Sequence, residues 1–142
     1  MPIVFISQQT FPAVLERYAA AGLDVDYRKE ASPLAAKTMH SRLKQADALH
    51  CLITDKVDEA TIAAAPHLKI VANVGVGYDN IDVIAATARG ILVSNTPDVL
   101  TDTTADLTMA LILATARRLS EADPYLRAGQ YKQWALFQPH LG

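Results

Sequence analysis

Short, continuously apolar segments alternate with helical segments through most of the chain, and this order constrains the fold more than any other feature. Apolar runs that do not alternate with polar residues are typical of parallel strands covered on both faces. Predicted strands cover residues 3–7, 25–28, 48–54, 69–74 and 91–95. Predicted helices cover residues 11–21, 33–46, 58–65, 80–89 and 101–119, with a further helix possible over 120–129 and an irregular segment from 130 onward.

Strict strand–helix alternation predicts an α/β protein with a doubly wound, five-stranded parallel sheet of the flavodoxin-like kind, in three α/β/α layers. The 142 residues amount to one domain. Local signals place some helix ends: Ser32 is the expected N-cap before Pro33, Gly90 closes the fourth helix, and Thr101 or Asp102 caps the long fifth helix.

Composition excludes several classes of function. A net charge of −2 with 20% charged residues gives no support to binding of nucleic acid or of a membrane surface. The start of the chain lacks the basic residues of a signal peptide, and the longest apolar helical stretch, around 107–116, is too short to span a bilayer. The single cysteine, Cys51, predicts a reducing, cytoplasmic setting and a buried, unreactive thiol.

The helix predicted over 101–119 is apolar around nearly its whole circumference. Nine apolar residues produce this pattern: Ala105, Leu107, Met109, Ala110, Leu111, Ile112, Leu113, Ala114 and Ala116. A helix that is apolar all round is expected to be buried on all sides, and one face of a sheet cannot cover it. A second domain or a second subunit would complete the burial; the alternative is that this is the central helix of the same domain.

The segment after the fourth predicted strand is the strongest candidate site. Gly75 and Gly77 lack Cβ atoms, so they can adopt positive φ and allow a ligand to approach the main chain. A helix beginning near Asn80 would add free N–H groups and the positive end of its dipole. A small carboxylate would fit this loop, while a tight turn without a ligand remains the alternative.

Other uses of the same fold fail on their residues. A dinucleotide loop needs G-x-G-x-x-G/A and a later acidic residue, but Asn80 occupies the third glycine position and Asn95 ends the next strand. The loop at 7–10 has no glycine for a flavin phosphate and no acidic residue for a phosphoryl-accepting receiver site, and Asp55 resembles an acceptor only superficially.

No histidine lies where acid–base chemistry at the glycine loop would need one. His40 is predicted in mid-helix, His50 within a strand, His67 in a turn at the opposite end of the sheet and His140 in the tail, and no pair has metal-ligand spacing. Taken alone, the chain is predicted to hold a small anion without transforming it.

Four segments carry a specific resemblance to a known family. They are Asn-Val-Gly-Val-Gly-Tyr-Asp-Asn-Ile-Asp at 73–82, Ala-Arg-Gly-Ile-Leu-Val-Ser-Asn-Thr-Pro-Asp at 88–98, Leu-Thr-Asp-Thr-Thr-Ala-Asp-Leu at 100–107 and Arg-Arg-Leu at 117–119. Together they resemble the D-isomer-specific 2-hydroxyacid dehydrogenases, most closely the glyoxylate/hydroxypyruvate reductase branch.

The resemblance implies a flavodoxin-like substrate domain over 1–100 and a long interdomain and dimerisation helix with its arm over 101–142. It implies that backbone amides at Gly75, Val76 and Gly77 hold the substrate carboxylate, and that Thr104 contacts the nicotinamide side of NAD or NADP. It also implies a homodimer built by the long helix and arm. Trp134 could reach a neighbouring active site, although an ordinary packing or surface role is equally open.

The family's glycine-rich cofactor loop and its catalytic arginine, glutamate and histidine have no counterpart in this sequence. The chain is therefore expected to be a truncated fragment without a Rossmann cofactor domain, inactive alone, from an NAD(P)-dependent enzyme acting on small 2-hydroxy or 2-oxo acids. The alternative is a stand-alone, non-catalytic binding or interaction module with the same fold. The sequence does not select NADH or NADPH, the particular acid, or the physiological direction.

Overall fold

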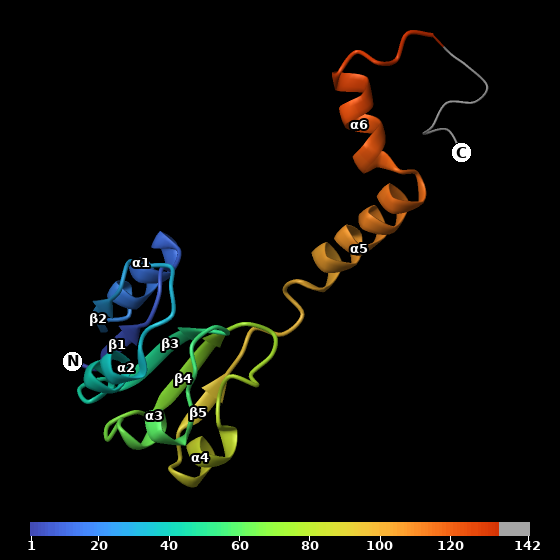
Figure 1. Ribbon diagram of the computed structural model, residues 1–142. Helices are drawn as coiled ribbons and strands as arrows, with labels where there is room; N and C mark the ends of the chain where they lie inside the picture. The colour runs from blue at the N-terminus through green and yellow to red at the C-terminus, as the bar shows by residue number, and fades with distance from the viewer. Residues whose placement is uncertain (134–142) are drawn as a thin grey trace. The chain divides into compact units, whose positions relative to one another are not determined.

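A computed structural model describes residues 1–133 of the chain. Its first unit, Met1–Asp98, contains a five-stranded parallel sheet in the order β2-β1-β3-β4-β5 (Figure 1). The strands are β1 Ile3–Ile6, β2 Asp24–Tyr27, β3 Ala48–Leu52, β4 Ile70–Val74 and β5 Leu92–Ser94. The predicted α/β fold with a flavodoxin-like parallel sheet is confirmed.

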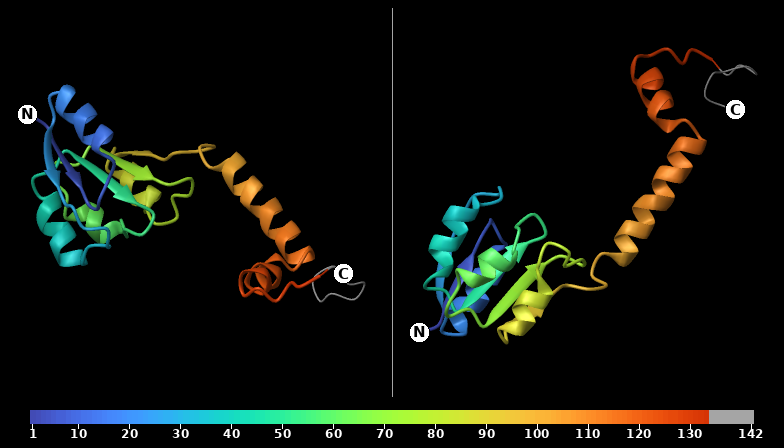
Figure 2. Two further views of the ribbon diagram at one scale, coloured as in Figure 1. Left: turned by 90° about the horizontal axis from the view of Figure 1, so that it is seen from above. Right: turned by 60° about the horizontal axis from the view of Figure 1, so that its bottom comes forward.

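Helices cover both faces of this sheet. Within the first unit they are α1 Pro12–Ala20, α2 Ala36–Leu43, α3 Glu59–Ala63 and α4 Val83–Ala88. Figure 2 shows α1 and α2 on opposite sides of the sheet, which gives the predicted three layers. The main core lies beneath α2, α3 and α4, where Phe5, Leu49 and Val71 from three strands are fully or almost fully buried.

The face that carries α1 is only partly covered. Val4 and Ile6 are buried there, but Val74 at the end of β4 is 40% exposed and Leu92 on β5 is 68% exposed. An open hollow of about 590 Å³ lies between α1 and strands β3, β4 and β5. The two faces therefore differ: one is a closed core, and the other leaves the apolar side of β4 and β5 accessible.

Several predicted helix ends differ from the structure, and those at α2, α4 and α5 have a visible local cause. Helix α2 begins at Ala36 rather than Pro33, and its N-cap residue, Ala35, makes no side-chain cap. The expected cap, Ser32, instead accepts hydrogen bonds from the Arg28 guanidinium through its carbonyl and hydroxyl oxygens. That interaction holds Ser32 outside the helix.

The other two errors lie at α4 and α5. Helix α4 begins at Val83 rather than Asn80, because the Asp82 side chain accepts a hydrogen bond from Ala85 N at 2.9 Å and acts as the cap. The prediction that Thr101 or Asp102 caps the long helix is wrong, because both lie inside it and the N-cap is Leu100, which makes no side-chain cap. The helix ends at Ala116 rather than Leu119. It ends there because Arg118 takes the left-handed conformation, with φ 51°.

The second unit, which begins at Val99, contains α5 Thr101–Ala116 and α6 Leu119–Arg127. Helix α5 thus belongs to this second unit and not to the unit that contains the sheet. Large apolar side chains on several sides of α5 are 55–60% exposed: Leu107, Met109, Leu111, Ile112 and Leu113. No helix within residues 1–133 combines the length and apolarity that a membrane span requires.

Asp58 caps α3 and gives this unit a predicted pH dependence. Its Oδ1 accepts hydrogen bonds from Thr61 N at 3.0 Å and Thr61 Oγ1 at 2.9 Å, which lower the pKa of the carboxyl from 3.8 to about 2. Because the pKa is lower in the folded chain, the stabilisation is complete above pH 3.8 and is lost as pH falls through 2. Asp58→Ala is expected to lower the free energy of unfolding at pH 7 by about 0.5–2 kcal/mol.

Urea unfolding at a series of pH values checks this expectation. The difference between wild type and Asp58→Ala should shrink as pH falls towards 2, whereas Asp24→Ala, which removes an exposed carboxylate on β2, should leave stability nearly unchanged. A difference for Asp58→Ala that is the same at pH 7 and pH 2 would show that the cap does not act through the charged carboxylate.

Candidate functional site

The loop that joins β4 to α4 lies at the carboxyl edge of the sheet, where ligands of open parallel sheets bind. Its far end is fixed by an isolated parallel bridge between Val57 and Ile81. Val57 N donates to Asn80 O at 2.9 Å, and Asp82 N donates to Val57 O at 2.9 Å. Since β4 holds the near end, the segment from Gly75 to Tyr78 is a short span between two fixed points.

The carbonyl oxygens of Gly75, Val76 and Gly77 all accept hydrogen bonds from within the protein. Thr96 N donates to Gly75 O at 2.9 Å, Asn95 Nδ2 donates to Val76 O at 2.8 Å, and Asn73 Nδ2 donates to Gly77 O at 2.8 Å. None of these three oxygens is left to face a ligand alone. The loop therefore presents its N–H groups rather than its carbonyl groups.

Within residues 1–133, nothing accepts a hydrogen bond from the backbone N–H of Val76, Gly77 or Tyr78. Val76 is 47% exposed and Tyr78 is 54% exposed, so these donors lie in an accessible part of the surface. Successive backbone N–H groups can bind an anion without any cationic side chain where they converge on one point.

The glycines are needed for space and not for their backbone angles. Neither Gly75 nor Gly77 uses the positive φ that a glycine can adopt, since the glycines with positive φ in the described chain are Gly22, Gly90 and Gly129. A Cβ on Gly75 would lie 2.1 Å from Cγ2 of Ile53, in the loop after β3. A Cβ on Gly77 would lie 3.1 Å from Asp79 Oδ1, a much milder approach.

The predicted help from a helix N-terminus is also wrong. Helix α4 is short, begins at Val83 and has its own carboxylate cap in Asp82, so its end does not serve the glycine loop. Besides the Asp82 carboxylate at the start of α4, the Asp79 carboxylate lies close to Gly77. The electrostatic field of nearby side chains thus disfavours an anion, and attraction must come from the peptide N–H groups.

The described histidines do not contribute to this loop. His50 on β3 is 5% exposed, its Nδ1 lies 2.9 Å from Tyr18 Oη, and burial lowers its pKa, which favours the neutral imidazole. In α2, His40 Nε2 lies 3.2 Å from Thr61 Oγ1, and His67 lies in a turn. His140 is outside the described residues. No group of metal-ligating side chains occurs within 1–133.

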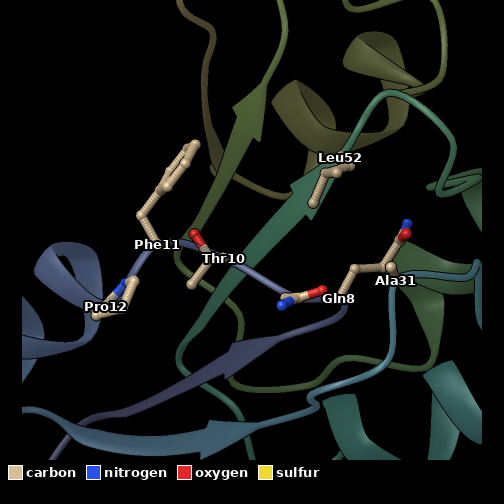
Figure 3. Close-up of a pocket in the computed structure, with 7 residues that line it drawn as sticks. Gln8, Thr10, Phe11, Pro12, Ala31 and Leu52 are labelled. Carbon is tan, nitrogen blue, oxygen red and sulfur yellow. The ribbon is translucent and has the colours of Figure 1, made fainter.

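The Cys51 thiol and the Gln8 side-chain amide, near the carboxyl ends of β3 and β1, have structural roles. Burial raises the pKa of the Cys51 thiol to about 12, as expected of an unreactive cysteine. Gln8, Thr10 and Leu52 line a separate hollow of about 310 Å³ beside the end of β1 (Figure 3). There Gln8 Nε2 donates to Thr54 Oγ1 at 2.8 Å, so this amide braces the β3 loop.

The glycine loop itself does not provide a dinucleotide-binding turn. Asn80, at the position of a third glycine, donates through Nδ2 to Leu52 O and Asp55 O and so fills the loop with a side chain. Thr104 lies in the first turn of α5, where its N–H donates to Leu100 O at 2.9 Å and its carbonyl accepts from Thr108 Oγ1 at 2.8 Å. Trp134, for which a contact with a neighbouring active site is one expectation, lies outside the described residues.

Sequence reasoning found the loop but missed the side chains that hold it. The sequence pattern places Asn73 in an apolar strand, and it assigns Asn95 no role beyond standing where a dinucleotide site would need an acidic residue. The available signal was a single amide side chain, Asn73, inside the otherwise apolar run of 70–74. A buried polar residue in a strand implies a specific partner, which here is the carbonyl of Gly77.

Comparison with known proteins shows which family the chain resembles. The chain is 46% identical over 135 residues to a glyoxylate reductase of Aeropyrum pernix, covering 95% of this chain and 39% of that protein. It is 52% identical over 109 residues to one of Korarchaeum cryptofilum, covering 77% and 33%. The chain thus spans about two fifths or less of the length of these relatives.

A solved structure of a glyoxylate/hydroxypyruvate reductase is also similar to this chain. The NADPH-dependent glyoxylate/hydroxypyruvate reductase of Sinorhizobium meliloti, in complex with citrate, superimposes with a TM-score of 0.79 at 34% identity, covering 99% of this chain and 43% of that one. The family model described as D-isomer specific 2-hydroxyacid dehydrogenase, catalytic domain, matches residues 3–134. The chain belongs to the D-isomer specific 2-hydroxyacid dehydrogenase family.

Proposed function

We propose that the unpaired N–H groups of Val76, Gly77 and Tyr78 bind the carboxylate of a small 2-oxo or 2-hydroxy acid of the glyoxylate or hydroxypyruvate kind. The observation that carries the proposal is that three consecutive carbonyls point into the protein while the three matching N–H groups lack a described acceptor. Gly75 and Gly77 keep side chains away from that surface. The glyoxylate reductase relatives support the choice of acid.

The proposal extends to the whole protein to which such a chain would belong. There it forms the substrate-binding and dimerising part of an oxidoreductase that uses NAD or NADP, with Thr104 as the cofactor contact named by resemblance. Because no described histidine lies at the loop and the loop forms no dinucleotide-binding turn, the part of these residues in the reaction is to bind and orient the acid. Reduction itself requires residues beyond those of this chain.

Titration of the ¹⁵N-labelled chain with glyoxylate tests the binding site directly. We expect the largest saturable amide shifts at Val76, Gly77 and Tyr78, since a carboxylate that accepts hydrogen bonds shifts its donors most. Methanol or ethylene glycol, which lack a carboxylate, serve as matched solute controls and should shift none of the three. Saturable binding that moves amides around Gln8 or α1 and leaves residues 76–78 unchanged would contradict the assignment.

A further inference from the structure

The three peptide groups of the binding loop are held by three separate donors, and two of those donors are asparagine side chains. Asn95 Nδ2 lies 2.8 Å from Val76 O, and Asn73 Nδ2 lies 2.8 Å from Gly77 O. Thr96 N, one residue further along, holds Gly75 O at 2.9 Å. Each loop carbonyl thus has its own partner.

Fixing a carbonyl also fixes the N–H of the following residue. A trans peptide is planar, and its C=O and N–H bonds point in opposite directions. The bond to Asn95 therefore sets the direction of the Gly77 N–H, and the bond to Asn73 sets that of the Tyr78 N–H. Donors that are already aimed lose little freedom when an anion binds.

Asn73 is itself locked by its surroundings. It is 2% exposed on β4, and its amide faces that of Asn80 with two contacts of 3.3 Å, Asn73 Nδ2 to Asn80 Oδ1 and Asn80 Nδ2 to Asn73 Oδ1. Asn80 Nδ2 also donates to Leu52 O at 3.2 Å and Asp55 O at 3.0 Å. Since two carbonyl oxygens surround that nitrogen, the orientation of both amide groups follows from the network.

No positively charged side chain of the described residues compensates for poorly oriented N–H groups in this loop. Within residues 1–133, no lysine or arginine side chain makes an ion pair or a hydrogen bond with residues 75–80, whereas Asp79 lies beside Gly77. A site without a cation depends on the direction of its N–H dipoles, which must overcome the repulsion of a neighbouring carboxylate.

We infer that Asn95 and Asn73 are positioning residues: they aim the Gly77 and Tyr78 N–H groups at the substrate carboxylate, and Asn80 keeps Asn73 in place. The inference rests on the proposed function for the identity of the ligand, but the orientation it describes exists without ligand. It also explains why amides, which can donate to a carbonyl, occupy positions 73 and 95. Aspartate at either position has the same shape and cannot donate when ionised.

Asn95→Ala is the primary variant, because Asn95 is half-buried and water can replace its amide without an unsatisfied group in the core. Ser94→Ala is the matched control: Ser94 is exposed, adjacent in sequence and not hydrogen-bonded to the loop. We expect Asn95→Ala to bind glyoxylate about tenfold more weakly, with a thermal midpoint close to that of wild type. Asn95→Gln, which keeps a donor, should recover part of the affinity.

Amide residual dipolar couplings of the ligand-free proteins provide the second measurement. In Asn95→Ala the coupling of the Gly77 N–H should change most, with Val76 less affected, because Thr96 still holds Gly75 O. Unchanged Gly77 couplings or unchanged glyoxylate affinity in Asn95→Ala would overturn the inference. If the wild-type chain binds no glyoxylate, the proposed function fails, and the inference then stands or falls on the Gly77 orientation alone.

Discussion

Gly75→Ala is expected to abolish saturable glyoxylate binding and to lower stability by about 1–3 kcal/mol, the usual cost of overpacking. The new Cβ would lie 2.1 Å from Ile53 Cγ2, closer than any real contact, so either the β3 loop or the glycine loop must move. Ile53 is branched at Cβ and has little rotamer freedom to withdraw that methyl group. Movement of the glycine loop would break the hydrogen bonds that hold its carbonyls.

A second substitution separates this mechanism from a general loss of fold. Ile53→Ala removes Cγ2, and the next nearest atoms to the new Cβ, Asn73 Nδ2 and Gly77 O, lie at an ordinary 3.5 Å. Ile53 is 57% exposed, so its truncation alone should cost little stability. The double variant Gly75→Ala, Ile53→Ala is therefore expected to regain most of the stability and glyoxylate affinity that Gly75→Ala loses.

Unfolding by urea and ¹⁵N titration with glyoxylate, applied to the four proteins of this cycle, give the coupling energy between the two positions. A strongly favourable coupling is the expected result. Equal losses in the single and double variants would mean that Gly75 is required for another reason, such as backbone flexibility. The milder approach at Gly77 predicts a smaller effect of Gly77→Ala on stability than of Gly75→Ala.

The sequence was sufficient for the sheet and insufficient for the details of the loop. Apolar runs identify four of the five strands because burial on both faces leaves few alternatives, whereas the edge strand β2, Asp24–Tyr27, alternates polar and apolar residues. Strict alternation with helices then implies parallel pairing. Helix ends were wrong wherever a tertiary or conformational effect replaced the local signal. Arg28 binds Ser32, and Arg118 adopts a left-handed conformation that no pattern indicates.

At the site, the glycine pair indicated where the main chain is accessible, but the reason for each glycine depends on contacts between distant residues. Ile53 follows β3 and lies close to Gly75, which follows the adjacent strand β4. Asn95 follows β5 and donates to the carbonyl of Val76. Neither relation is visible in local spacing. An amide inside an apolar strand was the one local clue to the network around Asn73.

The exposed apolar surface of α5 predicts a dimer that two substitutions should break. Leu107 and Leu111 are four residues apart, so they lie on one side of the helix, and they are 60% and 58% exposed. Burying two leucines in a dimer contributes about 3 kcal/mol or more, to which the burial of charge would add in a glutamate variant. Leu107→Glu with Leu111→Glu should therefore weaken dimerisation by at least ~100-fold.

Light scattering coupled to size-exclusion chromatography measures the change directly. Wild type is expected at twice the mass of one chain, and the double glutamate variant at the mass of one chain with unchanged circular dichroism. Thr38→Glu with Gln45→Glu, at exposed positions of the first unit, adds the same charge and should remain dimeric. A dimeric Leu107→Glu, Leu111→Glu variant would place the interface elsewhere. A monomeric wild type would mean that α5 does not pair two copies of this chain.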